Sequence, residues 1–324
     1  MEGLDEKDDR PVLLALRALK LGDLLVAVPA IHGLRRAFPD HALMLAMPGW
    51  LASIVRLVGG VDALLPTPGL DQPLAVPPGT VDIAVNLHGN GPESRGLLDA
   101  LGAREVVQHA RDDEYADPRQ PVWLDGIHER HRWARLVRAF GIRASENDVL
   151  IDVPRKPPVV VGAAVVHVGA FYGSRRWPED RFARVARALR DDGLAVVLTG
   201  SAAERERATA VARAAGLDDD AVLAGRTDLE QLAAVIAAAR IVVSGDTGAA
   251  HLASAYAVPS VVLFGPAPPE EWGPPPGPHI VLTDPSVRRG ETFSDIPDPA
   301  LLAVGSDAVI EAARSLLSRR SLPR

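Results

Sequence analysis

The segment SGDTG, residues 244–248, contains residue types that bind phosphate. It stands where an apolar run ends and a helix of small residues is expected to begin. Backbone N–H groups of Thr247 and Gly248, with the Thr247 hydroxyl, could bind a phosphate without a metal, because helix N-termini attract anions. A helix cap needs only Asp246, whereas the flanking glycines indicate close approach of the backbone to another group. The segment therefore favours phosphate binding.

A second candidate is the loop GAFYGSRRWPED, residues 169–180. It places Arg175 and Arg176 just before a helix, and paired guanidinium groups beside a helix N-terminus suit a diphosphate. The alternative is a solvated loop whose arginines pair with Glu179 and Asp180. The loop alone does not decide between the two interpretations.

A third candidate is the turn RALKLGDLLVAVPAI, residues 17–31, where a strand ends and Asp23 stands at the start of a helix. Ligands bind at the carboxyl ends of strands in open α/β sheets, so a general base fits this position. Aspartate is also among the best helix caps, and the turn alone favours that interpretation.

The histidines are less informative. His251, about one turn into the helix after residue 248, suits either a ligand contact or a buried core position. His128 and His131 have i, i+3 spacing, but the charged residues around them favour a solvated helical face over a metal site.

The chain has no cysteine, which excludes disulfides, thiol catalysis and cysteine-ligated metal. We predict no metal site.

Several familiar motifs are missing from the sequence. There is no GxxxxGK[ST] and no GxGxxG at a strand-to-helix turn, so neither a P-loop nor a dinucleotide fingerprint is present. A GxSxG elbow is also absent, which argues against α/β-hydrolase chemistry.

The first half of the chain alternates short apolar runs with helical patterns, which is typical of βαβ units and a parallel sheet. We expect strands at 12–16, 42–47, 81–87 and 105–109, and a helix over 23–38. Three prolines and two cations at 152–158 interrupt the alternation and predict a linker. The length also favours two domains, which we place at 1–152 and 153–324.

The second half repeats the alternation more regularly. The expected strands are 159–168, 195–200, 221–225, 241–245 and 260–265, and the expected helices are 179–190, 203–215, 229–239 and 247–256. The proline-rich stretch 266–278 should be a rigid loop, neither helix nor central strand. A final amphipathic helix over 306–318 could complete the second domain or pack back on the first.

Composition narrows the class of partner. The net charge of -7 gives no sign of nucleic-acid binding. The acidic N-terminus does not resemble a signal peptide, and no apolar run reaches the roughly 20 residues of a membrane span, so we expect a cytoplasmic protein without a transmembrane segment. Peripheral contact with a membrane stays compatible with this composition.

Four segments together resemble glycosyltransferase family 9, the ADP-heptose:lipopolysaccharide heptosyltransferases. The longest is GDTGAAHLASAYAVPSVVLFGPAPPEEWGP (245–274), similar to the family's Asp-Thr-Gly-x-x-His-Leu-x-x-Ala block and the Pro-x-Val-x-Leu-Phe-Gly-Pro run that follows it. The others are 22–39, 196–206 and 225–248, in the family's order and spacing. The resemblance runs through nearly the whole chain.

The resemblance implies an α/β protein of GT-B fold, two Rossmann-like domains whose parallel sheets face each other across a cleft. The N-terminal domain would bind the acceptor and the C-terminal domain the nucleotide, and the sugar would be transferred with inversion. Asp23 matches the family's general base. A nucleotide-diphosphate sugar, ADP-heptose in most of the family, would be the co-substrate, with no separate cofactor and no metal.

The same matching assigns the donor-binding residues. Arg175 stands where the family usually has a lysine that contacts the phosphates. Gly200, Glu204 and Thr227 would lie around the nucleoside, and Asp246, Thr247 and Gly248 around the diphosphate or the sugar. The full predicted set adds Gly22, Arg175, Arg176 and His251.

Two departures from the family pattern bear on the acceptor: Asn86 stands where an aspartate is frequent, and cysteines near the C-terminus are missing. A glycan, a lipid-linked acceptor or a small molecule are all compatible. Three other functions stay open. They are a GT-B sugar-nucleotide epimerase, a catalytically inactive nucleotide-binding homologue and, least supported because the glycine fingerprint is missing, a dehydrogenase.

Overall fold

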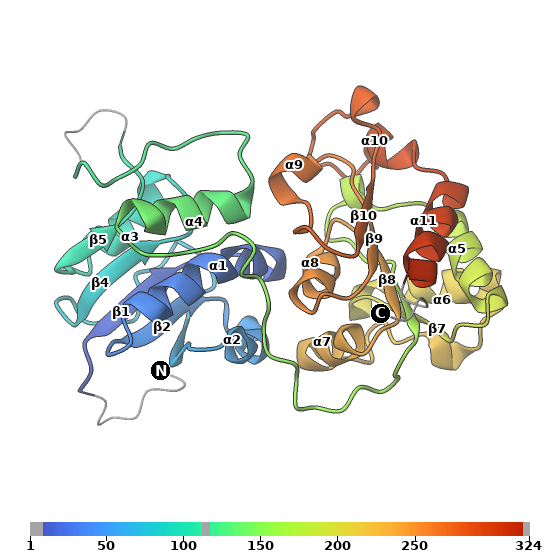
Figure 1. The fold of residues 1–324 in the computed structure, drawn as a ribbon, viewed down its shortest axis with the longest axis horizontal. Coiled ribbons are helices and arrows are strands. Elements are labelled where there is room, and N and C mark those ends of the chain that lie inside the picture. The colour runs from blue at the N-terminus through green and yellow to red at the C-terminus, as the bar shows by residue number, and fades with distance from the viewer. Residues whose placement is uncertain (1–8, 112–116, 320–324) are drawn as a thin grey trace. The chain divides into compact units, whose positions relative to one another are not determined.

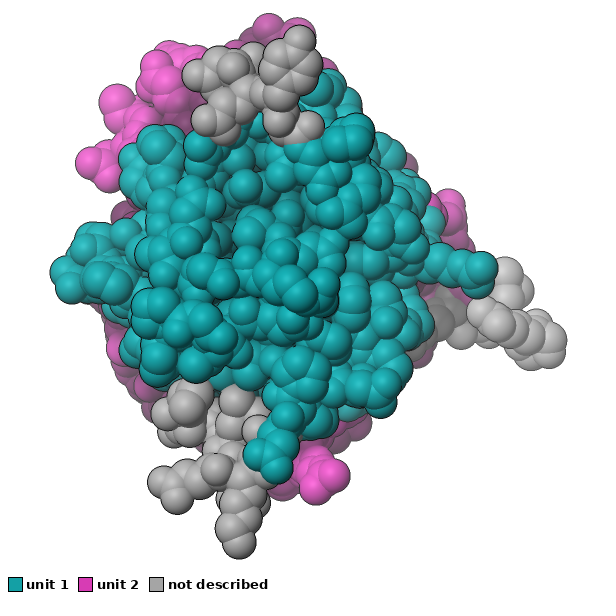
Figure 2. Space-filling view, turned by 90° about the vertical axis from the view of Figure 1, so that its left-hand side faces the viewer, with its two compact units in different colours: residues 1–152 teal, residues 153–324 magenta. Residues whose placement is uncertain are grey.

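A computed structural model describes residues 9–111 and 117–319 (Figure 1). The chain divides into two compact units, Met1–Asp152 and Val153–Arg324, which are coloured separately in Figure 2. The boundary falls in the proline-containing segment 152–158. In the described part of the chain no helix has both the length and the apolarity that crossing a membrane requires.

The first unit contains a five-stranded parallel sheet in the order β3-β2-β1-β4-β5. Its strands are β1 (Val12–Leu16), β2 (Ala42–Met47), β3 (Ala63–Pro66), β4 (Val81–Asn86) and β5 (Glu105–Val107). Its helices are α1 (Leu21–Ala37), α2 (Ala52–Val58), α3 (Pro92–Asp99) and α4 (Glu129–Ala139). The predicted strands at 12–16 and 42–47 are confirmed at both ends, because each is a short apolar run bounded by polar or turn residues.

The start of α1 differs from the prediction. The helix begins at Leu21, two residues before Asp23, and Lys20 is its N-cap. Asp23 is thus the third helical residue, and its Oδ2 accepts the N–H of Lys20 at 3.2 Å. The carboxylate therefore does stabilise the helix start, by accepting the backbone N–H of the N-cap residue and not as the cap itself.

The second unit contains another five-stranded parallel sheet, in the order β10-β9-β8-β6-β7. Its strands are β6 (Ala164–His167), β7 (Val196–Thr199), β8 (Ile241–Gly245), β9 (Ser260–Leu263) and β10 (His279–Leu282). Its helices are α5 (Glu179–Asp191), α6 (Arg205–Ala215), α7 (Leu229–Ala237), α8 (Gly248–Ala255), α9 (Pro269–Trp272), α10 (Pro299–Leu302) and α11 (Ser306–Arg319).

Both faces of this second sheet are covered, as a parallel sheet requires. Figure 1 shows α7 and α8 on one side and α5, α6 and α11 on the other. The C-terminal helix α11 packs on α5 and on the strands β8, β9 and β10, so it completes the second unit. Trp177 and Phe182 lie in the core of this unit with their rings edge to face at 4.9 Å.

Three expectations for the second unit are wrong. Residues 221–225 form no strand: Val222 makes a single bridge to Leu198, and Gly225 has a φ of 69°, which ends any extended run. The proline-rich stretch contains the one-turn helix α9, because a proline in the first turn lacks only an N–H that has no intrahelical partner. The strand expected over 159–168 is formed only at Ala164–His167.

Candidate functional site

The predicted donor-binding residues of the second unit gather at the carboxyl edge of its sheet. His167 pairs in register with Thr199 on β7 and with Ser244 on β8, so the three strands end side by side. The loops that follow them, at 168–178, 200–204 and 246–247, therefore share one edge. This is the edge at which open parallel sheets bind ligands.

Arg175 and Asp246 form a contact between two of these loops. The Arg175 Nη1 lies 3.0 Å from Asp246 Oδ2 and donates to the Asp246 carbonyl oxygen at 3.2 Å. The Asp246 side chain is almost completely buried and Arg175 is largely so, with exposed fractions of 4% and 24%. The pair thus joins the loop after β6 to the loop that begins α8.

The alternative interpretation, in which Arg175 and Arg176 pair with Glu179 and Asp180, is wrong. Arg175 pairs with Asp246, and Arg176 donates its Nε to the carbonyl oxygen of Ala170 at 3.2 Å. Glu179 pairs instead with Arg207, at 3.1 Å. The paired guanidinium groups are therefore held apart by different partners, and Arg175 alone reaches the start of α8.

Thr247 is the N-cap of α8, in extended conformation, but its side chain makes no capping hydrogen bond. Its hydroxyl lies 2.9 Å from the Ser244 Oγ instead. The first-turn N–H groups of α8 consequently receive no side-chain cap, which suits an external acceptor such as a phosphate. A Cβ on Gly245 would lie 3.4 Å from the Arg175 carbonyl oxygen, so the close approach at this glycine is to the protein's own backbone.

His251 lies on the first turns of α8, with its Nε2 3.8 Å from Asp246 Oδ1 and a side chain that is 12% exposed. It is not isolated in the apolar core, and it does not pair closely with the carboxylate either. Asp246 therefore lies between Arg175 and His251.

Glu204 holds two loops together at the neighbouring strand ends. Its Oε2 accepts the N–H of Ser201 at 2.7 Å, and a Cβ on Gly169 would lie only 2.2 Å from the same oxygen. Burial tends to raise the pKa of Glu204, but hydrogen bonds from Ser201 and Ala170 and the nearby His167 outweigh burial and lower it. The ionised carboxylate therefore links the loops after β6 and β7.

Gly200 and Thr227 lie at the same corner. The N–H of Gly225 donates to the Gly200 carbonyl oxygen at 3.1 Å, so the loop that leads to Thr227 contacts the turn after β7.

Sequence reasoning missed His167, whose Nδ1 lies 3.0 Å from the Thr199 hydroxyl. Burial lowers the pKa of this histidine, and the charge of Glu204 opposes that effect.

The candidate base of the first unit is held by a buried arginine. The Arg17 Nη2 lies 3.5 Å from Asp23 Oδ1 and 3.6 Å from Glu129 Oε2 on α4, and its Nη1 donates to the Leu87 carbonyl oxygen. Burial lowers the pKa of Arg17, while the charges of Asp23 and Glu129 raise it. Gly22 precedes Asp23 in the first turn of α1, in a different unit from the other predicted donor-binding residues.

Asn86 is the last residue of β4, and His88 lies in the turn that follows, near Arg17 and Asp23. The Asn86 Oδ1 accepts the N–H of His88 at 3.1 Å, and its Nδ2 donates to Ser94 at 3.1 Å, so the amide fixes the turn. Burial lowers the pKa of His88, as does the charge of Arg17, while Asp23 raises it. Neither Arg17 nor His88 was found from the sequence, because no local pattern connects them with Asp23.

The segment of His128 and His131 has a structural role. His128 is the N-cap of α4, and its Nδ1 accepts the N–H of Arg130 at 3.1 Å. The His131 Nδ1 lies 2.6 Å from Glu146 Oε2. The expected solvated face is wrong for Arg130 and Arg132, which are buried. Over residues 9–111 and 117–319, no group of three or more His, Cys, Asp or Glu side chains is placed to hold a metal.

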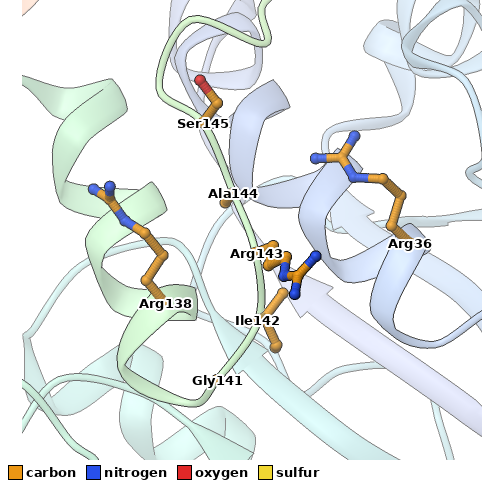
Figure 3. Close-up of a pocket in the computed structure, with 7 residues that line it drawn as sticks. All are labelled: Arg36, Arg138, Gly141, Ile142, Arg143, Ala144 and Ser145. Carbon is orange, nitrogen blue, oxygen red and sulfur yellow. The ribbon is translucent and has the colours of Figure 1, made fainter.

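A separate hollow of about 480 Å³ opens on the first unit (Figure 3). Three arginines line it: Arg36 from α1, Arg138 from α4 and Arg143 from the loop that follows. Asp148 binds Arg36 at 2.7 Å. Because Arg36 and Asp23 are at opposite ends of α1, roughly 20 Å apart along the helix, the hollow is not part of the candidate site.

Comparison with known proteins places the sequence match mainly in the second unit. The family model "Glycosyltransferase family 9 (heptosyltransferase)" matches residues 144–283. Lipopolysaccharide heptosyltransferase 2 of Salmonella typhimurium is 34% identical over 164 residues, 48% of this chain and 46% of the relative. Lipopolysaccharide heptosyltransferase 1 of Pseudomonas aeruginosa is 45% identical over 135 residues, 41% of this chain and 36% of the relative. The match thus spans less than half the length of these curated relatives.

Solved structures match along almost the whole chain. A glycosyl transferase family 9 protein from Veillonella parvula has a TM-score of 0.76 at 20% identity, covering 97% of this chain and 99% of that one. E. coli ADP-heptose lps heptosyltransferase II has a TM-score of 0.75 at 21% identity, covering 96% and 100%. At these identities the likeness shows the fold. The chain therefore has the GT-B fold of these enzymes and resembles the heptosyltransferases of glycosyltransferase family 9 in sequence, above all in its second unit.

Proposed function

We propose that this protein is an inverting glycosyltransferase that moves a sugar, heptose from ADP-heptose, to an acceptor hydroxyl. The carrying observation is the contact of Arg175 with Asp246 beside the uncapped first turn of α8. This contact lies in the segment that matches the family model. An anion-binding helix start next to a positioned guanidinium is what a nucleotide diphosphate needs.

Arg175 and α8 bind the diphosphate in this proposal. The carboxylate and the backbone carbonyl oxygen of Asp246 both contact Nη1 of Arg175, so the guanidinium is already oriented before the donor binds. Its Nε is buried and makes no hydrogen bond within the described residues. Charge that develops on the leaving diphosphate is stabilised by this guanidinium and by the first-turn N–H groups of α8.

Asp23 is the general base in this proposal. It accepts the proton of the acceptor hydroxyl while that oxygen attacks the anomeric carbon, and the nucleoside diphosphate leaves from the opposite face. Arg17 and the Lys20 N–H hold the carboxylate in place. One carboxylate is enough for a single displacement with inversion. The reaction as proposed needs no divalent metal, and activity that a chelator abolishes and Mg²⁺ restores would contradict this.

The first test is calorimetric titration of the full chain with ADP, UDP and GDP in metal-free buffer. We expect ADP to bind in preference to the other two, and Thr247→Ala to weaken that binding. The matched control is Thr209→Ala, whose hydroxyl donates to the Arg205 carbonyl oxygen within its own helix. No binding of any nucleotide to the wild type would reject the proposed function.

The second test separates transfer from other uses of the same nucleotide site. Purified protein is incubated with ADP-heptose, with and without a panel of glycan, lipid-linked and small-molecule acceptors, and ADP release is followed together with the anomeric configuration of the product. Acceptor-dependent release with inversion supports the proposal. Conversion of the donor without an acceptor would identify an epimerase, and binding without any conversion would identify an inactive homologue.

A further inference from the structure

Three aromatic side chains lie together at the surface of the second unit, two of them on the loop that carries Arg175. Phe171 and Phe293 are 74% and 75% exposed, although large apolar residues are usually covered. Tyr172 lies between them, with ring centroids 4.9 Å from Phe171 and 5.1 Å from Phe293, both edge to face. We call Phe171, Tyr172 and Phe293 the aromatic platform.

The platform is assembled from two loops that are bonded to each other. Ser174 donates its N–H to the Ser294 carbonyl oxygen at 2.8 Å and its hydroxyl to the Thr292 carbonyl oxygen at 2.7 Å. Gly173 permits this contact, because a Cβ there would lie 1.9 Å from the Asp295 carbonyl oxygen. The two loops that carry the rings are thus held together before any ligand binds, which lowers the entropy cost of ordering them on binding.

Both loops lie at the ligand-binding edge of the sheet. Tyr172 is three residues before Arg175 in the same loop. The second loop is attached to the end of the neighbouring strand β9, where Arg288 Nε donates to the Gly265 carbonyl oxygen at 2.9 Å. The aromatic platform is therefore carried by loops at the same edge of the sheet as the proposed diphosphate site.

The size of the platform fits a single ring. An aromatic side chain contributes about 150–250 Å², so two rings exposed by three quarters present roughly 300 Å². A stable protein interface needs about 800 Å² from each partner, far more than these rings offer. The nucleobase is also assigned elsewhere, to the corner of Gly200, Glu204 and Thr227 after β7.

We propose that the aromatic platform binds the sugar ring of the nucleotide-sugar donor through the C–H face of that ring. This inference rests on the proposed function, because it takes the donor diphosphate to lie at Arg175. Aromatic rings cover apolar C–H groups and leave the hydroxyls of a sugar to water or polar partners. The platform thus contributes affinity for the sugar itself, beyond that for the nucleotide.

The test compares ADP with ADP-heptose as calorimetric ligands for the full chain. The wild type should bind ADP-heptose more tightly than ADP. Phe171→Ala, Phe293→Ala and the double variant should bind ADP unchanged, and the double variant should lose about tenfold in affinity for ADP-heptose as the covered apolar area is lost. Phe293→Tyr keeps the ring and should retain the affinity of the wild type.

The control variant is Val161→Ala, which removes apolar surface from an equally exposed position of the same unit, 74% exposed. It should bind both ligands like the wild type. Equal weakening of ADP and ADP-heptose in the platform variants would overturn the inference, since the rings would then act on the nucleotide or on the loop.

Three other results also contradict the inference. If the wild type binds ADP-heptose no more tightly than ADP, the sugar makes no favourable contact. If the platform variants bind both ligands normally but raise the KM for the acceptor, the ring bound is that of the acceptor. If the wild type binds neither ligand, the proposed function itself fails, which differs from the other outcomes because ADP binding is then lost as well.

Discussion

The guanidinium of Arg175 lies 3.0 Å from the carboxylate of Asp246, a residue 71 positions further along the chain. Asp246 is nearly buried, and a buried carboxylate is costly unless an opposite charge compensates it. The contact therefore stabilises the fold and, in the proposed function, also orients the guanidinium for the donor. These two roles can be separated by experiment.

We expect Arg175→Met to lower the free energy of unfolding by about 3 kcal/mol or more, because Asp246 is left buried without its partner. The double variant Arg175→Met/Asp246→Asn should recover most of that stability while ADP binding stays weak, since the guanidinium is still missing. Urea unfolding and calorimetry measure the two effects. Arg314→Met, which breaks the exposed pair with Asp192, is the control and should hardly change either quantity. Restored ADP binding in the double variant would show that Arg175 does not contact the donor.

Arg17 should be essential to the stability of the first unit. It is 3% exposed, contacts Asp23 and Glu129, and lies over the Trp133 ring at 4.8 Å. Arg17→Met removes the partner of Asp23, while Glu129 keeps its ion pair with Arg132 at 2.7 Å, and should cost about 3 kcal/mol in urea unfolding. The exposed Arg10, paired with Asp62, gives the comparison variant Arg10→Met, for which we expect little change. If Arg17→Met and Arg10→Met lowered the free energy of unfolding equally, the stabilising role of Arg17 would be refuted.

His109 should make stability depend on pH. Burial, with the charges of Arg132, Arg135 and Arg95, lowers its pKa from 6.5 to about 3. Between these values the unfolded chain binds a proton that the folded protein does not. The contribution is therefore complete above pH 6.5 and is lost as the pH falls toward 3, at no more than about 1.4 kcal/mol per pH unit.

Urea unfolding of His109→Phe between pH 7 and pH 4 checks this prediction. Phe does not titrate, so the variant should lose stability less steeply than the wild type. Both ring nitrogens of His109 are buried without a hydrogen bond in the described residues, so the substitution leaves no partner unsatisfied. Asp82→Asn should hardly change the slope in this interval, because the hydrogen bond from Arg104 lowers the pKa of Asp82 from 3.8 to about 2, so its contribution is lost mainly below pH 4. Identical slopes for His109→Phe and the wild type would be the contrary result.

Asp23→Asn tests the proposed base. General-base assistance is typically worth about 10²–10⁴ in rate, so kcat should fall by that factor, while the affinity for ADP should stay close to that of the wild type. The exposed carboxylate of Asp40, on the same unit, supplies the control Asp40→Asn. Full turnover by Asp23→Asn with weakened donor binding would remove Asp23 from the catalytic role.

Much of the fold followed from local sequence features. The runs at 12–16 and 42–47 are strands over the predicted residues, and the SGDTG segment stands between β8 and α8 as expected. Apolar periodicity and turn residues act over a few positions, so they can be read without knowledge of the partners. Strands β3 and β10 were missed because their four-residue runs form strands only through pairing with β2 and β9.

In the candidate site too, local sequence features identified some residues, and contacts between distant segments were needed to find the others. The sequence by itself identified Asp23, Glu204 and the start of α8 as candidates, because each stands at a strand-to-helix turn or in a motif. Only the tertiary structure joined Arg175 to Asp246 and brought Arg17, just after β1, together with Glu129 from α4. It also showed that the glycine at 245 serves close packing within the protein. Contacts between distant segments depend on how strands are ordered in a sheet, and no local pattern of residues encodes that order.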